Sequence, residues 1–202
     1  MTTVREPKQD RSRATRLRLL EATIDCLAES GWSATTVADV AERAGVSRGA
    51  AQHHFPVRED LITAALEFMF DSRMTTAMDA AKSAGASAAR KTETVISELV
   101  EYFTGPMFKA ALQVWTAAAA DPALKERIVP LEAKFGRTAH RLTIDALGVD
   151  DSDPATHQLV QATLDLARGL GLADVLTDDS ARRKKIVRRW AATLDTALKP
   201  KP

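Results

Sequence analysis

Apolar residues recur every three or four positions along most of this 202-residue chain, and this spacing constrains its fold more than any other feature. No run of alternating β-branched residues competes with the helical pattern, and glycine and proline mostly fall between the periodic segments. A chain of this kind buries one apolar stripe per helix. The pattern therefore predicts an all-α protein with about nine helices.

Glycine and proline divide the periodic segments into separate helices. These are expected at about residues 11–30, 36–44, 47–53, 58–82, 92–103, 106–119, 122–147, 154–176 and 180–198. Gly31 and Gly45 are expected to end the first two helices, and Ser47 to cap the third. Pro130 lies inside the seventh and is expected to kink or split it. A connection is predicted at residues 85–88 and a frayed tail at residues 199–202.

Composition excludes several classes of protein. The net charge is only +1, so any nucleic-acid binding has to come from local clusters of charge. The single cysteine, Cys26, excludes a disulfide framework and a cysteine-built zinc site. It is expected to be a small buried apolar residue, with redox sensing as the alternative. No apolar segment is typical of a signal peptide or long enough to span a bilayer, which predicts a cytoplasmic protein with no membrane partner.

The peptide Ala44-Gly45-Val46 joins the second and third predicted helices with the spacing of a helix-turn-helix. Such a turn needs a residue that accepts a left-handed backbone, and Gly45 supplies it. The start of the third helix can then direct backbone N–H groups and a positive dipole end at phosphate or base edges. The turn alone fits equally well a tight helical hairpin with no role in DNA binding.

The residues on both sides of this turn form a longer pattern. Residues 31–50, GWSATTVADVAERAGVSRGA, are followed by His53-His54-Phe55-Pro56 and Arg58-Glu59-Asp60-Leu61. Over about residues 11–62 this pattern strongly resembles the DNA-binding domain of the tetracycline-repressor-like (TetR) family of transcriptional regulators. The resemblance implies an all-α homodimer with a three-helix DNA-binding domain, here residues 1–57, and a ligand-binding and dimerisation domain, here residues 58–202. It implies no enzyme, and instead a repressor that binds a palindromic operator in double-stranded DNA and is released by a small molecule.

The resemblance also assigns contacts with the DNA backbone. Thr36 and Ser47 match hydroxyls that contact phosphate. His53 matches a backbone contact late in the recognition helix, and Arg58 stands where the family usually has a lysine that touches phosphate. Phe55 matches the aromatic residue that packs the third helix on the first.

Base recognition is assigned to the start of the third helix, where Arg48, Gly49 and Ala50 match positions that face base edges. Arg48 is the strongest candidate because a guanidinium group pairs bidentately with guanine, although a phosphate or surface role is the alternative. Two residues depart from the family pattern. Gln52 replaces a tyrosine that stacks on the DNA backbone and can instead donate to phosphate or bind adenine. Ala51 is smaller than the usual apolar residue.

Two clusters of basic residues need separate interpretations. The first surrounds the start of the first helix and comprises Arg5, Lys8, Arg11, Arg13, Arg16 and Arg18. Next to a helix-turn-helix it favours contact with the DNA backbone or minor groove, and a solvated terminus is the alternative. The second comprises Arg182, Arg183, Lys184, Lys185, Arg188 and Arg189. It lies on an amphipathic helix after Asp174, Asp178 and Asp179, which can pair with the basic residues or favour the start of the helix.

The later helices are expected to provide the dimer surface and the effector site. By family resemblance the dimer forms through the last two helices, and small residues such as Ala162 and Gly169 permit close helix approach. The effector is expected to be mainly hydrophobic and to lie among the fourth to eighth helices. The candidate lining residues, each of which is alternatively a core or surface residue, are Phe68, Met69, Tyr102, Phe103, Phe108, Trp115, His140 and Arg168.

No signature of a catalytic, cofactor or metal site occurs in the sequence. His53 and His54 are adjacent rather than one helical turn apart, and His140 and His157 lie far from them, so no metal and no cofactor are predicted. Two rival functions stay open. One is a helical enzyme or small-molecule carrier, and the other is an interaction protein whose helix-turn-helix is vestigial.

Overall fold

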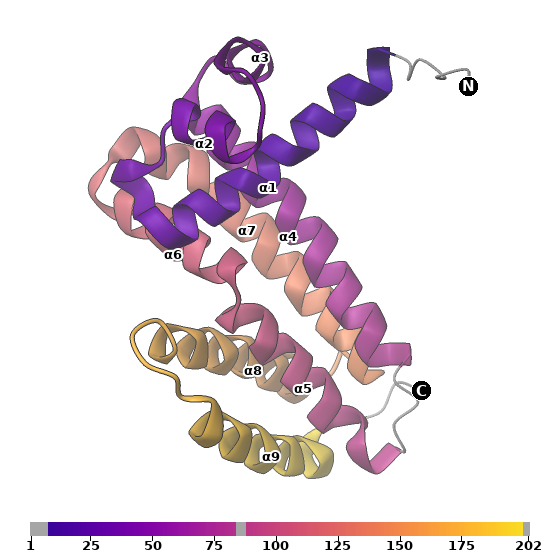
Figure 1. Ribbon diagram of the computed structural model, residues 1–202. Helices are drawn as coiled ribbons and strands as arrows, with labels where there is room; N and C mark the ends of the chain where they lie inside the picture. The colour runs from indigo at the N-terminus through magenta and orange to yellow at the C-terminus, as the bar shows by residue number, and fades with distance from the viewer. Residues whose placement is uncertain (1–7, 84–87, 200–202) are drawn as a thin grey trace. The chain divides into compact units, whose positions relative to one another are not determined.

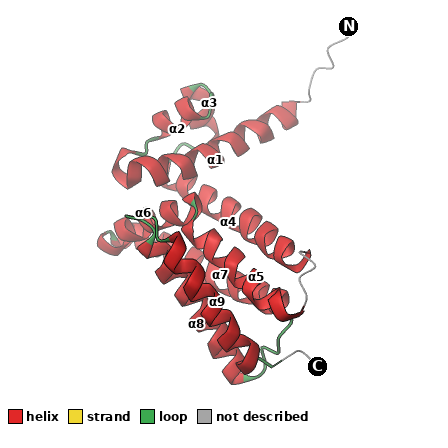
Figure 2. Cartoon of the chain, turned by 60° about the horizontal axis from the view of Figure 1, so that its bottom comes forward, coloured by secondary structure: helices red, strands yellow, loops and turns green. Residues whose placement is uncertain are grey.

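The computed structural model describes residues 8–83 and 88–199. Within these residues it contains nine helices and no strand (Figures 1 and 2), which confirms the all-α prediction. The helices are α1 (Lys8–Ala34), α2 (Val37–Arg43), α3 (Arg48–His54), α4 (Arg58–Ser83), α5 (Ala88–Thr104), α6 (Pro106–Ala120), α7 (Pro122–Leu147), α8 (Pro154–Ala173) and α9 (Ser180–Ala197). Arg5 and the predicted connection, up to residue 87, lie outside the described residues.

Contacts between residues divide the chain into two compact units. The first unit comprises Met1–Met69 with Lys109–Val129, and the second comprises Phe70–Phe108 with Pro130–Pro202. Helices α4, α6 and α7 each contribute residues to both units. The predicted boundary between residues 57 and 58 separates a DNA-binding domain from a ligand-binding domain. The compact units do not test this functional division, which stays a prediction.

In the first unit, α1 packs against α2 and α3, and α2 packs against α3. The side chains that fill this contact are almost completely buried and include Leu19, Leu20, Ile24, Leu27, Val40 and Ala41. Leu17, which the helical spacing suggests for the buried stripe, is 38% exposed, and Leu19 is buried instead. Cys26 is buried, as predicted, and burial raises the pKa of its thiol.

Gly31 interrupts α1 where the sequence predicts its end. Its φ of 79° and ψ of 179° are not helical, and a further helical turn, Trp32 to Ala34, follows it. A Cβ atom at Gly31 would lie 3.2 Å from Oε1 of Gln113, so this position also favours glycine because of its close neighbour.

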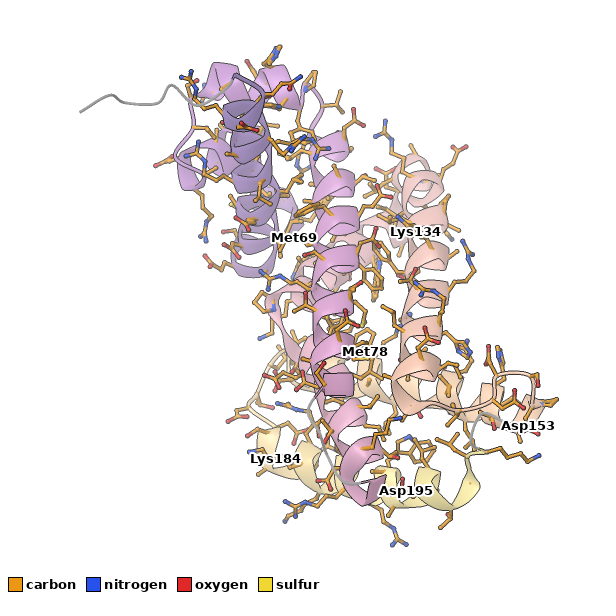
Figure 3. The ribbon with its side chains drawn as sticks, turned by 90° about the vertical axis from the view of Figure 1, so that its right-hand side faces the viewer. Met69, Met78, Lys134, Asp153, Lys184 and Asp195 are labelled. Atoms are coloured by element: carbon orange, nitrogen blue, oxygen red, sulfur yellow. The ribbon has the colours of Figure 1, made fainter. Side chains whose placement is uncertain are left out.

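In the second unit, α5 packs against α8 and α9, which also contact each other (Figure 1). The rings of Phe70 from α4 and Phe135 from α7 are stacked with their centroids 4.0 Å apart. Lys134, labelled on α7 in Figure 3, binds Asp71 of α4 at 3.1 Å. Helix α7 continues through Pro130 and is not split there. No helix in the described part of the chain is long and apolar enough to cross a membrane.

Candidate nucleic-acid interface

The turn between α2 and α3 is fixed by its backbone. Gly45 has a φ of 63°, which confirms the predicted left-handed conformation. Its N–H donates to the carbonyl of Glu42 at 3.1 Å, and the N–H of Val46 donates to the carbonyl of Ala41 at 3.0 Å. These two bonds form a Schellman motif, which satisfies the last carbonyls of α2. The angle between α2 and α3 therefore depends on a turn that only glycine adopts without strain.

Side-chain caps define the starts of both helices. Thr36 Oγ1 accepts a hydrogen bond from the N–H of Asp39 at 3.2 Å, and Asp39 Oδ2 accepts one from the N–H of Thr36 at 3.0 Å. The hydroxyl of Thr36 also donates to Asp39 at 2.5 Å, and this bond is the main reason why the pKa of Asp39 is lowered. Ser47 Oγ accepts from the N–H of Ala50 at 3.2 Å and leaves its own proton to donate outward. Both predicted phosphate-binding hydroxyls thus also cap helices.

Helix α3 presents a polar face to solvent. Arg48, Gly49, Gln52 and His53 are exposed, and their spacing places them on one side of the helix. Ala51 lies on the opposite side and is completely buried, so its small size belongs to the packing of α3 rather than to its outer face. The exposed set contains most of the residues that the sequence predicts for base recognition.

Aromatic packing holds α3 against α1. Phe55, at the end of α3, is buried, and the guanidinium of Arg16 lies 5.1 Å from the centroid of its ring. His54 is half-buried, and burial lowers its pKa, with smaller contributions from His53 and Arg16. Arg11, Arg13 and Arg18 are exposed along α1. Arg16 thus packs on the ring of Phe55, whereas Arg13 is exposed, as a contact with DNA requires.

Arg58 has a structural role that the sequence does not reveal. Its guanidinium Cζ lies 4.2 Å from the centroid of the Trp32 ring. Its Nε donates to the carbonyl of Thr35 at 2.6 Å, and its Nη2 donates to the carbonyl of Trp32. Arg58, at the start of α4, therefore binds the segment between α1 and α2 through these contacts. The phosphate contact that resemblance implies for Arg58 stays a prediction.

Comparison with known proteins identifies this domain. Residues 19–65 match the family model of the bacterial regulatory proteins of the tetR family. Over 132 residues the chain is 31% identical to the HTH-type transcriptional regulator CymR of Pseudomonas putida. Residues 19–65 are thus similar to the TetR family of bacterial regulatory proteins.

The match to the family model covers the helix-turn-helix, and the similarity to individual proteins is longer. The CymR alignment covers 63% of this chain and 63% of CymR. The chain is also 30% identical over 121 residues to the HTH-type transcriptional regulator BetI of Burkholderia thailandensis, which covers 59% of this chain and 62% of BetI. The chain thus matches less than two thirds of the length of either relative. A transcriptional regulator from Rhodococcus sp. RHA1 has the same fold, with a TM-score of 0.68 and 23% identity over 93% of this chain and 99% of that one.

The second unit contains an aromatic cluster, which we define as Phe70, Tyr102, Phe103, Phe108 and Phe135. The ring of Tyr102 meets Phe70 edge-to-face at 5.8 Å and Phe103 edge-to-face at 5.4 Å. Phe103 meets Phe108 edge-to-face at 5.4 Å. The cluster joins α4, α5, α6 and α7 within this unit, and these geometries are the favoured ones for aromatic pairs.

Two buried polar atoms lie at the aromatic cluster. Tyr102 Oη and Arg168 Nε are buried and have no hydrogen-bond partner among the described residues. Arg168 of α8 lies over Phe103, with Cζ 5.8 Å from the ring centroid, and pairs with Glu132 of α7 at 3.2 Å. Burial raises the pKa of Glu132, and the charge of Arg168 opposes this effect. Burial also raises the pKa of Tyr102.

Of the eight predicted effector-binding residues, Tyr102, Phe103, Phe108 and Arg168 meet at the aromatic cluster of the second unit. Phe68, Met69 and Trp115 belong to the first unit, and His140 contacts Asp151 beyond the end of α7. The binding of an effector by these residues stays a prediction. Phe70, Phe135 and Glu132, which also lie at the aromatic cluster, are not among the residues predicted from the sequence. The helical spacing marks the two phenylalanines as apolar positions, but it does not show that they meet.

An apolar groove lies between α8 and α9. Its floor contains Ala162 and Leu166 of α8 and Ile186 and Trp190 of α9, and its rim contains Arg182, Lys185 and Arg189. Trp190 Nε1 donates to Thr163 Oγ1 at 2.9 Å, which orients the indole ring. An adjoining face of α9 buries Val187, Ala191 and Leu194 in the unit. Helix α9 therefore has a second apolar face beside α8, and Lys184 and Asp195 mark its two ends in Figure 3.

Three residues of the second basic cluster pair with carboxylates, and two of these carboxylates are the predicted Asp174 and Asp179. Arg183 binds Asp174 at 2.6 Å, and Arg182 Nε binds Asp179 at 2.8 Å. Arg188 lies 3.5 Å from Glu93 of α5. These contacts give Arg182, Arg183 and Arg188 partners within the unit.

Proposed function

We propose that this chain is a transcriptional repressor that binds a palindromic operator as a homodimer and is released by a small, mainly hydrophobic effector. The observation that carries the proposal is the exposed polar face of α3, which follows a rigid turn and a capped start. In a helix-turn-helix this helix enters the major groove and its first residues contact base edges. A cytoplasmic location follows from this role.

Direct recognition of bases rests on Arg48 in this proposal. Its side chain is exposed at the first position of α3, and a guanidinium group pairs bidentately with guanine O6 and N7. Gln52 follows one helical turn later on the same face. The amide of Gln52 can pair with adenine or donate to phosphate, whereas the tyrosine usual in the family at this position stacks on the DNA backbone.

Binding to the DNA backbone rests on Arg13, Thr36, Ser47, His53 and Arg58. Arg13 is exposed on α1, and Ser47 has a hydroxyl proton to donate. These contacts add affinity without sequence preference and make binding depend on salt.

Dimerisation through α8 and α9 is supported by the apolar groove between them. Leu166, Ile186 and Trp190 are only half-buried within one chain, and the basic residues lie at the rim rather than on the floor. An apolar centre with a polar rim is typical of protein interfaces. A dimer also supplies the two recognition helices that a palindrome requires.

Effector binding is supported by the aromatic cluster. Buried polar atoms in proteins nearly always have partners, and an atom without one calls for a water or a ligand. Tyr102 Oη and Arg168 Nε are two such atoms among aromatic rings. A ligand with an apolar body and a hydrogen-bond acceptor satisfies both. In a thermal-shift screen, we expect mainly apolar compounds to raise Tm; stabilisation by small, highly polar compounds alone contradicts this part of the proposal.

The decisive experiment is selection of bound DNA from a random pool by the purified full chain at moderate salt. We expect a palindrome with half-sites about one helical turn apart. Recovery of no preferred sequence, with binding that disappears at moderate salt, favours the rival carrier or vestigial-domain function.

Single variants then test the assigned contacts on the selected operator. Arg48→Ala is expected to lose about 1–3 kcal/mol of preference for the operator over altered sites. Arg13→Ala is expected to weaken binding to all sequences and to reduce the slope of log K against log salt by about one. Arg141→Ala, which changes an exposed arginine of α7, is the matched control. Equal behaviour of all three variants contradicts the assigned roles.

The dimer surface is tested by Leu166→Arg, which places a charge on the floor of the groove. We expect the variant to elute as a monomer and to bind operator weakly. Leu176→Arg is the control because Leu176 is 90% exposed in the α8–α9 connection. A Leu166→Arg protein that remains dimeric contradicts dimerisation through this groove.

A further inference from the structure

His140 and His157 meet at the carboxylate of Asp151, beyond the end of α7. His140 comes from α7, Asp151 from the turn after it, and His157 from α8. His140 Nε2 lies 2.7 Å from Asp151 Oδ1, and His157 Nδ1 lies 2.9 Å from the same oxygen. The two imidazole rings are 4.4 Å apart between centroids. We call these three residues the His-Asp-His cluster.

The neighbouring carboxylates of this turn are engaged differently. Asp150 Oδ1 accepts hydrogen bonds from the N–H and hydroxyl of Ser152. Asp153 caps α8 by accepting from the N–H of Thr156 and also binds Lys199 (Figure 3 labels Asp153). Helix capping and the local turn therefore account for two of the three aspartates, and Asp151 alone is directed at the histidines.

The donor atoms of the His-Asp-His cluster have the spacing of a metal site. One nitrogen of each histidine and one oxygen of Asp151 all lie within 4.8 Å of one another. Tetrahedral zinc has bonds of about 2.0–2.1 Å to nitrogen and oxygen, which places its ligand atoms about 3.3 Å apart. The two contacts to Asp151 are shorter than this by a few tenths of an ångström. Because Asp151 is exposed in a turn, a small movement of its side chain opens the required space.

A neighbouring amide is placed to orient one of the ligands. Gln161 Nε2 lies 3.0 Å from His140 Nδ1, and His140 itself is buried between α7 and α8. A metal bound at Nε2 requires the proton on Nδ1, and after a flip of the Gln161 amide its oxygen accepts a hydrogen bond from this N–H group. Metal-binding histidines commonly have such a partner on the second nitrogen. Gln161 is therefore a positioning residue.

We propose that His140, Asp151 and His157 bind a zinc ion through two imidazole nitrogens and one carboxylate oxygen. This donor set is characteristic of zinc among the common divalent ions, and three protein ligands leave a fourth position for water. The ion joins the end of α7, the turn after it and the start of α8. The competing arrangement is a hydrogen-bonded trio with no affinity for metal.

The test is titration of the metal-free full chain with Co²⁺, whose tetrahedral complexes absorb visible light, followed by displacement with Zn²⁺. We expect one ion per chain and a rise in Tm with Zn²⁺. His157→Ala removes an exposed ligand and is expected to weaken binding at least a hundredfold, and Asp151→Asn is expected to weaken it as well. Gln161→Leu is expected to weaken binding about 10–100-fold, as loss of an orienting partner does.

His53→Ala is the matched control because it removes an exposed histidine from α3, and it is expected to bind Co²⁺ as the unaltered chain does. Circular dichroism of each variant confirms that its helices are retained. Absence of a visible band and of a Tm shift overturns the proposal. Equal affinity in the His157→Ala variant overturns it as well, because the ion then binds elsewhere. Neither result affects the proposed binding of operator DNA, which is measured separately.

Discussion

Gly171 of α8 lies directly against the backbone of Phe103 at the end of α5. A Cβ atom at Gly171 would lie 2.2 Å from the carbonyl oxygen of Phe103 and 2.9 Å from Cε1 of Phe108. No Cβ atom fits there without a shift of the backbone. The close approach of α8 to α5 also brings Arg168, one turn earlier on α8, over the ring of Phe103. The absence of a side chain at Gly171 therefore helps to build the aromatic cluster.

Gly171→Ala is expected to destabilise the second unit by about 1–3 kcal/mol, the usual range for an overpacked core. The matched control is Gly169→Ala in the same helix, where a Cβ atom meets nothing within 4 Å. Alanine at this helical position is expected to raise the free energy of unfolding by about 0.4–1 kcal/mol. Urea denaturation of both variants measures the difference. Equal effects at the two positions contradict the close packing of Gly171.

Gly45→Ala is expected to destabilise the helix-turn-helix for a different reason. A Cβ atom at Gly45 meets nothing within 4 Å, so only the backbone φ of 63° opposes it. The left-handed conformation costs an L-residue about 1–2 kcal/mol. Urea denaturation measures the loss, and hydrogen exchange at Val46 reports whether the Schellman bond persists. Gly49→Ala, in regular helix with open space around it, is the control and is expected not to destabilise the fold.

The sequence predicts the helix-turn-helix well because its signals are local. Gly45, Ser47 and the apolar pair Val40 and Ala41 act over one or two helical turns, and the structure confirms the conformation or burial of each. The same local rules fail where two positions compete for one stripe. Leu17 and Leu19 both fit a helical period, and tertiary packing buries only Leu19.

Contacts between distant helices were beyond the reach of the sequence. Helical spacing marks Phe70 and Phe135 as apolar, but only the packing of α4 on α7 shows that they stack. His140 and His157 are seventeen positions apart, and they meet because the turn at Asp151 reverses the chain between α7 and α8. A single sequence contains no information on which partner such a residue meets.

Asp153 is expected to make stability depend on pH in acid. Hydrogen bonds from Lys199 and from Thr156 lower the pKa of Asp153 to about 2. This pKa lies below the value of an aspartate in the unfolded chain, so the unfolded state binds more protons in acid. The contribution of Asp153 to the free energy of unfolding is therefore complete only above about pH 4. It is lost as the pH falls through the folded value. Asp153→Asn is expected to be less stable than the parent at pH 6 in urea, and the difference is expected to shrink at pH 2.

The partner of this pair provides the control. Lys199→Met is expected to show part of the same loss of pH dependence. The double variant is expected to lose no more free energy of unfolding than Asp153→Asn alone, because the two side chains share one interaction. Additive losses contradict the pairing. A difference between Asp153→Asn and the parent that stays constant from pH 6 to pH 2 contradicts the lowered pKa.

Tyr102 is expected to resist ionisation in the folded chain. Burial raises its pKa, and it is the only tyrosine, so absorbance near 295 nm follows its phenol alone. In the unfolded chain a tyrosine ionises near pH 10. The unfolded state therefore releases the proton first, and stability is expected to fall as the pH rises above about 10. A titration that shows phenolate with the helical circular dichroism intact near pH 10 contradicts burial of the hydroxyl.

Tyr102→Phe is expected to leave stability unchanged or to raise it by about 1 kcal/mol in the absence of effector. The variant keeps the edge-to-face contacts with Phe70 and Phe103 and removes a buried hydroxyl that has no partner among the described residues. A buried polar group without a partner costs about 1–3 kcal/mol, so its deletion relieves that penalty. If the hydroxyl anchors the effector, the same variant also needs more effector for release from operator. A clear loss of stability in urea contradicts the first expectation, because it shows that the hydroxyl already has a partner in the folded chain.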